Sequence, residues 1–221
     1  MKPLALALLV LLAAVQTFLP ALAAGLAVQS AGLAVLRRDY GDAVTCTLSA
    51  AADTYVRSDQ SGSSFGGSAS LLVSNSSSST RRGLLEFDLG GCSPAIPVDA
   101  IVHEATLRLT TSSLLNVGPR TYGLRRATAA WSESTSWSTQ PPAAGSLTSS
   151  ATIGVTVVVG TPIDWPVATD VQSFVSGLAT NHGWQLADTV EGVTPLLSAS
   201  ISFASREASS GQPRLTITYA P

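Results

Sequence analysis

Short stretches in which apolar and polar residues alternate are the feature that most restricts how this chain can fold. Residues 105–110 and 214–219 each carry apolar side chains at every second position, with threonine or arginine between them. In an extended strand, this alternation places an apolar and a polar face on opposite sides. Such two-faced strands, separated by turn residues, favour an antiparallel sandwich or barrel. We therefore predict an all-β fold, an antiparallel β-sandwich of the jelly-roll type.

Several segments carry the strand signal, and one segment breaks it. The predicted strands lie at residues 54–57, 70–74, 82–89, 104–111, 122–130, 151–159, 183–187, 198–204 and 214–219. Elsewhere, four apolar residues follow the i, i+3, i+4, i+7 spacing of a helix: they are Val171, Phe174, Val175 and Leu178. Asp170 would cap the start and Gly177 would end it. The spacing predicts one short helix at 170–178 that closes an end of the sandwich.

The N-terminus has the form of a signal peptide. Lys2 precedes an apolar run at 4–15, and the small residues of Ala21-Leu22-Ala23 follow Pro20. A charged start, an apolar run and an A-x-A site predict export with cleavage after Ala23. The expected location is therefore secreted or at the cell surface.

The predicted organisation has three parts. Residues 1–23 are the signal peptide, 24–45 an apolar leader or linker, and 46–221 the β-sandwich domain. The alternative for the N-terminal part is an uncleaved anchor or a pilin-like helix. Apolar character continues to Leu36, and a spanning helix needs about 20 apolar residues. Contact with a membrane is expected only if this segment is retained.

Two cysteines, Cys46 and Cys92, are present in the chain. In an exported protein, an even pair indicates one disulfide. This bond would join the first strand region to the loop that follows Leu89. The alternative is a pair of buried free thiols.

The low charge of the chain limits its partners and its chemistry. Charged residues make up 12% of the chain, and the net charge is −2, which argues against nucleic acid as a partner. The sequence contains no G-x-S-x-G, H-E-x-x-H or P-loop motif, so we predict that it is not an enzyme. No cofactor is expected, although loop carboxylates could hold a structural calcium ion. The candidate calcium ligands are Asp53, Asp59, Glu86, Asp88, Asp164 and Asp170.

Trp131 and Trp137 flank Glu133 in the most distinctive string of the sequence. In a functional interpretation, the indole rings stack on sugar rings while nearby polar groups bond the sugar oxygens. In a structural interpretation, both indoles close the end of the core. Both interpretations stay open at this level.

Arginine supplies all the positive side chains after Lys2. Guanidinium groups on one sheet face could bind the carboxylates of an acidic polysaccharide. The alternative is ordinary pairing with Glu86, Glu104 and Glu207. With the two tryptophans, the predicted carbohydrate-binding residues are Trp131, Trp137, Arg57, Arg82, Arg108 and Arg206.

A series of strings in fixed order covers about residues 45–219. The strings lie at 52–56, 65–67, 82–89, 105–109, 131–133, 203–207 and 213–219. Together they resemble the DNRLRE domain family of secreted bacterial and archaeal proteins. The resemblance implies a jelly-roll β-sandwich that serves as a module, and some members are classed with modules that bind polysaccharides such as alginate. Glu86 departs from the family pattern, where a basic or neutral residue is expected.

Two functions are compatible with these features. The first is a non-catalytic secreted or cell-surface domain that binds extracellular polysaccharide. The second is a structural subunit of an extracellular filament, sheath or coat. In that case copies of the protein are its partners, and residues 24–45 would add a strand to a neighbouring subunit.

Overall fold

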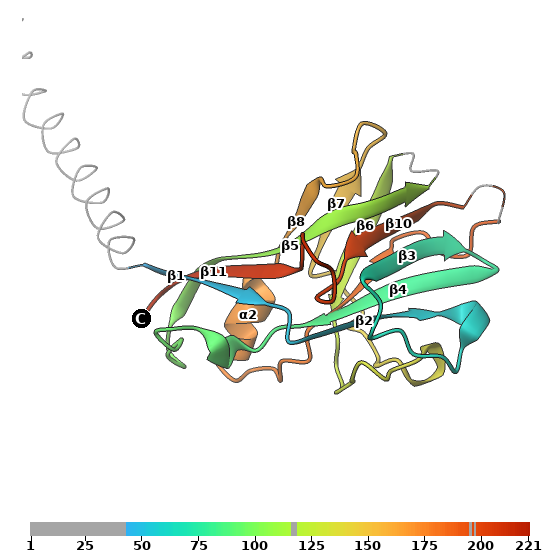
Figure 1. The fold of residues 1–221 in the computed structure, drawn as a ribbon. Helices are drawn as coiled ribbons and strands as arrows, with labels where there is room; N and C mark the ends of the chain where they lie inside the picture. Colours follow the sequence, from blue (N-terminus) through green and yellow to red (C-terminus); the bar gives the residue numbers. More distant parts are fainter. Residues whose placement is uncertain (1–42, 116–118, 195, 197) are drawn as a thin grey trace, which may run out of the picture. The chain divides into compact units, whose positions relative to one another are not determined.

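A single long strand, β5 (Ile101–Leu115), takes part in both halves of the fold. The computed structural model describes residues 43–115, 119–194, 196 and 198–221 (Figure 1). The first half of β5 pairs with β11 (Arg214–Ala220) on one side and with β8 (Pro162–Pro166) on the other. Its second half pairs with β10 (Ser200–Ala204). The leader at 24–45, and with it the proposed strand donation, lies almost wholly outside the described residues.

The remaining strands complete a curled antiparallel structure. They are β1 (Val44–Ser49), β2 (Ala52–Arg57), β3 (Ser70–Ser76), β4 (Ser79–Glu86), β6 (Arg120–Arg126), β7 (Ser149–Ile153) and β9 (Trp184–Asp188). Their order is β1-β11-β5-β10-β3-β4-β9-β6-β7, with β2 beside β4. Every pairing between these named strands is antiparallel. The predicted all-β, jelly-roll-like sandwich is confirmed.

The inward faces of the strands build the main core. The alternating residues Ala105, Leu107 and Leu109 are fully buried, and so are Leu215 and Ile217 from the neighbouring strand. Removing a leucine or isoleucine side chain from water contributes roughly 1.5–3 kcal/mol. The period-2 pattern therefore identified the face that drives this half of the sheet to fold.

Two tryptophans that could have been core or surface residues lie in the core. Trp165 is fully buried, meets Phe203 edge to face and donates its indole N–H to the carbonyl of Tyr122 at 3.1 Å. Trp184 is 1% exposed and packs against Phe174. A buried indole that also satisfies its N–H stabilises the core without a polar cost.

The helix α2 (Ala168–Val175) packs against β5 (Figure 1). Gln172 fixes it there, because its side chain accepts from the N–H of Val102 at 2.8 Å and donates to the carbonyl of Ala100 at 3.1 Å. Gly177 follows the helix with a positive φ of 69°. Within the described residues, no helix has the length and apolar character needed to cross a membrane.

Some predicted boundaries differ from the observed ones. The helix begins at Ala168 rather than at Asp170, whose carboxylate accepts from the indole N–H of Trp184 at 2.8 Å instead of capping the helix. Leu178 lies beyond the helix and is 84% exposed. The strand predicted at 151–159 ends at Ile153, where Gly154 leads into an exposed loop.

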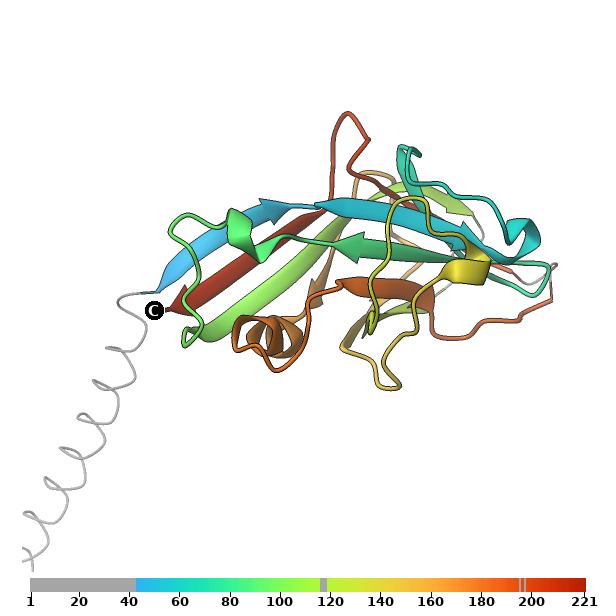
Figure 2. The ribbon, with the colours of Figure 1, turned by 90° about the horizontal axis from the view of Figure 1, so that it is seen from below.

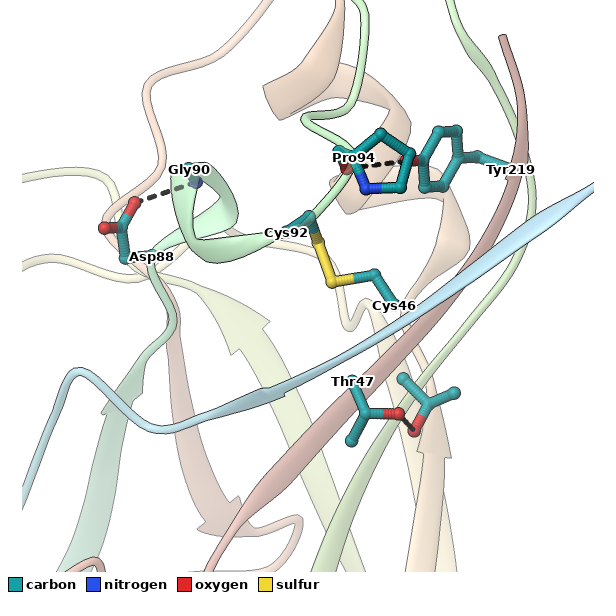
Figure 3. Close-up of a disulfide and its surroundings, with 8 residues drawn as sticks. Cys46, Thr47, Asp88, Gly90, Cys92, Pro94 and Tyr219 are labelled. Atoms are coloured by element: carbon teal, nitrogen blue, oxygen red, sulfur yellow. Dashed lines mark hydrogen bonds between the residues drawn. A yellow bond between two sulfur atoms is a disulfide. The ribbon is translucent and has the colours of Figure 1, made fainter.

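The disulfide between Cys46 and Cys92 is confirmed (Figure 3). It joins β1 to the residue that follows the 3-10 helix η2 (Leu89–Gly91). Next to it, the hydroxyl of Tyr219 donates to the carbonyl of Pro94 at 2.9 Å. The bond therefore ties the loop after β4 to the edge strand of the sheet.

Candidate functional site

The outer face of β4 carries a second, smaller buried layer. Val56 and Leu84 are fully buried, yet they are not part of the main core cluster. Another part of the chain must therefore cover this face. The segment 127–148 does so (Figure 2, yellow), since its Gln140 accepts from Arg82 on β4 and its Ser138 N–H donates to the carbonyl of Ser61, which follows β2.

Trp137 reaches this face and stacks over an arginine. It begins the 3-10 helix η3 (Trp137–Thr139), and its ring lies 4.8 Å from the guanidinium carbon of Arg82. Arg82 also makes two bonds to Glu191, at 2.7 and 2.6 Å. Its third contact is to the side-chain oxygen of Gln140 at 3.1 Å. The guanidinium thus lies over an indole ring and is paired with a carboxylate through two of its nitrogens.

A hollow of about 350 Å³ lies next to this stack. It is lined by Arg82, Arg125, Gln185, Ala187, Asp188, Thr189 and Glu191. Its volume falls within the roughly 300–1,000 Å³ typical of small-molecule sites. Amide, hydroxyl, carboxylate and guanidinium groups converge here beside an indole, a combination able to bond the hydroxyl groups of a sugar.

Arg125 and Gln185 lie opposite each other on β6 and β9. The Gln185 amide donates to Gln140 at 3.1 Å, which links the hollow to the Trp137 segment. Among the described residues, the side chain of Arg125 makes no hydrogen bond or ion pair. It therefore retains donors that a ligand could use.

Trp131 and Arg206 hold the segment in place rather than line the hollow. The indole N–H of Trp131 donates to the carbonyl of His182 at 2.8 Å. Arg206 pairs with Glu133 at 2.8 Å and with Glu207 at 3.1 Å. These contacts favour the structural interpretation for Trp131.

The other two predicted arginines lie elsewhere. Arg57 pairs with Asp59 and lies over the ring of Phe65. Arg108 makes two 2.7 Å bonds to Asp164 across β5 and β8. Of the expected glutamate partners, Glu207 alone pairs with one of the six predicted residues within the described part of the chain. The carbohydrate-binding role of all six residues stays a prediction.

The outer face around Arg108 has a hollow of its own, of about 440 Å³. Threonines such as Thr106 and Thr216 line it together with Glu104 and Arg214. No aromatic ring lines this hollow, and Asp164 already occupies Arg108. Trp137 does not line the hollow beside Arg82 either, but its ring lies against Arg82, which does line it, so that hollow is the better candidate for a sugar ring.

The carboxylates considered for calcium do not gather. Asp59 and Asp164 are each bonded to an arginine, and that pairing holds the pKa of both carboxyls below the usual range. No three His, Cys, Asp or Glu side chains within the described ranges could hold a metal ion together. The calcium possibility gains no support from these residues.

Some residues of the hollow were missed by the sequence patterns. Gln185 could have been found, because it faces away from the core between Trp184 and Leu186. Glu191 could not, since it lies 109 residues from Arg82 in the chain. Only the fold brings Glu191 and Arg82 together.

Gly183 sets the turn that supports this site. Its φ is +67°, and a Cβ there would lie 1.9 Å from the carbonyl oxygen of Leu85. Gly183→Ala should therefore force β9 away from β4, at a cost of about 2–3 kcal/mol in the free energy of unfolding. Urea unfolding measures this loss of stability. Gly145→Ala is the control, because a Cβ at Gly145 meets nothing within 4 Å. Equal stability of the two variants would contradict the prediction.

Comparison with known proteins adds one finding. The family model of carbohydrate-binding module family 96 matches residues 44–219. No curated protein matches the chain significantly. The family match confirms the carbohydrate-binding part of the resemblance, while the DNRLRE assignment itself stays a prediction.

Proposed function

Because this chain belongs to carbohydrate-binding module family 96, we propose that it is a non-catalytic module that binds an extracellular polysaccharide beside Trp137. The family supplies the class of ligand. The polar hollow and the indole supply a place where a sugar ring could stack and be bonded.

The stack of Trp137 on Arg82 is the observation that carries this proposal. Arg82 is fixed by Glu191 and Gln140, so little side-chain freedom would be lost on binding. Arg125 contributes to the same hollow a cation that is not paired with any described residue. This combination favours a sugar that carries hydroxyl groups and a carboxylate.

Export forms part of the proposal. The sequence pattern of residues 1–23 is that of a signal peptide. A disulfide is compatible with an oxidising compartment. A secreted or cell-surface location would give the module access to polysaccharide outside the cell.

Affinity electrophoresis of the full chain tests the binding site. We expect retardation in gels that contain an acidic polysaccharide, and Trp137→Ala should weaken the affinity about tenfold, equivalent to 1.4 kcal/mol. Trp137→Phe should retain part of the affinity, because a ring remains.

Arg108→Ala is the matched control. It removes a cation from the other outer face and should leave retardation unchanged. Retardation lost with Arg108→Ala but kept with Trp137→Ala would move the site to the threonine-lined hollow. No retardation of the wild type in any polysaccharide gel would overturn the proposed function.

A further inference from the structure

Arg81 is a half-buried cation whose side chain has no partner among the described residues. Its Nε is buried without any hydrogen bond. Among the described residues, its guanidinium forms no ion pair. Burial, followed by the positive charge of nearby Arg57, lowers the pKa of Arg81. A buried charge normally has a counter-charge, because an unpaired one costs several kcal/mol.

The neighbouring charges do not neutralise it. Arg81 lies opposite Arg57 on β2, and Asp59 is close to both. Asp59, however, makes its bonds to Arg57 and to the hydroxyl of Ser79. Two cations and one carboxylate leave a net charge of +1 in this group, so one negative charge would balance it.

A hollow of about 260 Å³ opens beside Arg81. Six serines contribute to its lining, including Ser74, Ser76 and Ser200, and no Asp or Glu does. It is far larger than the ~30 Å³ of one water molecule. It is smaller than the roughly 300–1,000 Å³ of sites that enclose a drug-sized ligand. The size therefore fits a small anion or one charged substituent.

We propose that this hollow binds an oxyanion, a carboxylate or sulfate group, through Arg81 and the serine hydroxyls. A planar guanidinium matches the paired oxygens of either group. The Ser74 hydroxyl already donates to the carbonyl of Ser79, and the Ser79 hydroxyl to Asp59. Ser200 and one hydroxyl of the bonded pair Ser76 and Ser78 can donate to the remaining oxygens. The same chemistry covers a free ion and an acidic substituent on a glycan.

The site is separate from the hollow beside Trp137. Arg81 and Arg82 are consecutive residues of β4, and successive side chains of a strand point to opposite faces. Each lines its own hollow. The two sites can therefore be disabled independently.

Sodium sulfate is the first probe, added to the full chain with ionic strength held constant by sodium chloride. We expect a saturable shift of the Arg81 Nε–H resonance in NMR spectra. A rise in Tm of about 3–5 °C at ten times Kd should accompany it. Arg81→Gln should abolish the saturable rise, whereas Arg214→Gln, which removes an exposed cation from β11, should keep it.

Ser200→Val gives a second test that keeps the guanidinium. It fills the hollow with a residue favoured in strands and should weaken the sulfate response at least tenfold. Arg81→Gln should itself fold, since removing an unpaired buried charge is neutral or stabilising. An equal sulfate response in wild type and Arg81→Gln would overturn the proposal, because sulfate also stabilises proteins without a site.

Comparing sodium glucuronate with uncharged glucose tests whether the site requires a negative charge on the ligand. A saturable response to glucuronate or sulfate that glucose does not produce and that Arg81→Gln abolishes supports the site, and no response to either anion overturns it. Weaker binding of uronic-acid oligosaccharides by Arg81→Gln identifies a glycan substituent as the source. Unchanged binding identifies a free ion. Trp137→Ala should leave the sulfate response intact, so a failure of this proposal is distinct from a failure of the glycan site.

Discussion

Replacement of Cys46 and Cys92 by alanine is expected to lower the free energy of unfolding by about 4 kcal/mol. The disulfide closes a loop with a sequence separation of 46 residues. Constraining a loop of that length in the unfolded chain corresponds to about 4 kcal/mol at 25 °C in the chain-entropy treatment. The loss should be large because the bond holds an edge strand, β1, which pairs with β11 alone among the described strands.

Thermal and urea unfolding of the oxidised protein and of the double variant measure this effect. A domain of this size should lose roughly 8–16 °C in Tm. Addition of a reductant should bring the wild type to the level of the variant and leave the variant unchanged. Glycan binding at 25 °C should persist in the variant, since the hollow is built from β4, β6 and β9. A loss below 1 kcal/mol would show that the unfolded chain is already constrained without the bond.

The strands that the sequence predicted well have one buried and one exposed face. In β5 and β11, apolar side chains alternate with threonine and arginine, and the buried positions are those expected. Both strands have solvent on their outer face, so the pattern is visible without any tertiary information.

The strands that the sequence did not predict, β1 and β8, lack a clear alternation of apolar and polar residues for physical reasons. β8 begins and ends with proline, at Pro162 and Pro166, and proline restricts a strand to an edge. β1 buries only Cys46 and Leu48, so its alternation is too short to recognise. Both become strands because a neighbouring strand supplies the hydrogen-bond partners.

The candidate site likewise depends on tertiary contacts that the sequence does not reveal. Trp137 and Arg82 could be selected from the sequence as residue types, but not as a stacked pair. Arg108 looked equivalent to Arg82 because the carboxylate that each arginine meets is distant in the sequence, whereas Arg57 and Arg206 have a partner one or two residues away. Those carboxylates are supplied by separate loops and strands.

Asp53→Asn is expected to make the protein more stable than wild type at pH 8, while the two should be close at pH 4. Asp53 is fully buried on β2. One carboxylate oxygen accepts from the N–H of Arg206 at 2.7 Å, and the other has no hydrogen-bond partner. Burial, together with the nearby Glu207 carboxyl, raises the pKa of Asp53 to about 7 against the opposing effect of Arg206.

The sign of the pH effect follows from proton binding. Between about pH 4 and pH 7 the folded protein holds a proton on Asp53 that the unfolded chain has released, so stability falls as the pH rises through this window. With about 3 units between the two pKa values, the cost at pH 8 is on the order of 4 kcal/mol. Asparagine cannot ionise and still accepts from Arg206, so the variant avoids that cost.

Urea unfolding of both proteins from pH 4 to pH 8 tests this, and the difference between them removes the effects of other groups. Those groups include Glu207 beside Asp53, the Arg206 guanidinium, and Glu133, which Arg206 also bonds. Parallel pH profiles would mean that Asp53 ionises with a normal pKa. If the two stability profiles diverge as the pH rises, the fold is stabilised by a neutral Asp53 carboxyl that accepts from the N–H of Arg206. Because Arg206 also holds the Trp137 segment through Glu133, glycan binding should then weaken above pH 7 in the wild type but not in Asp53→Asn.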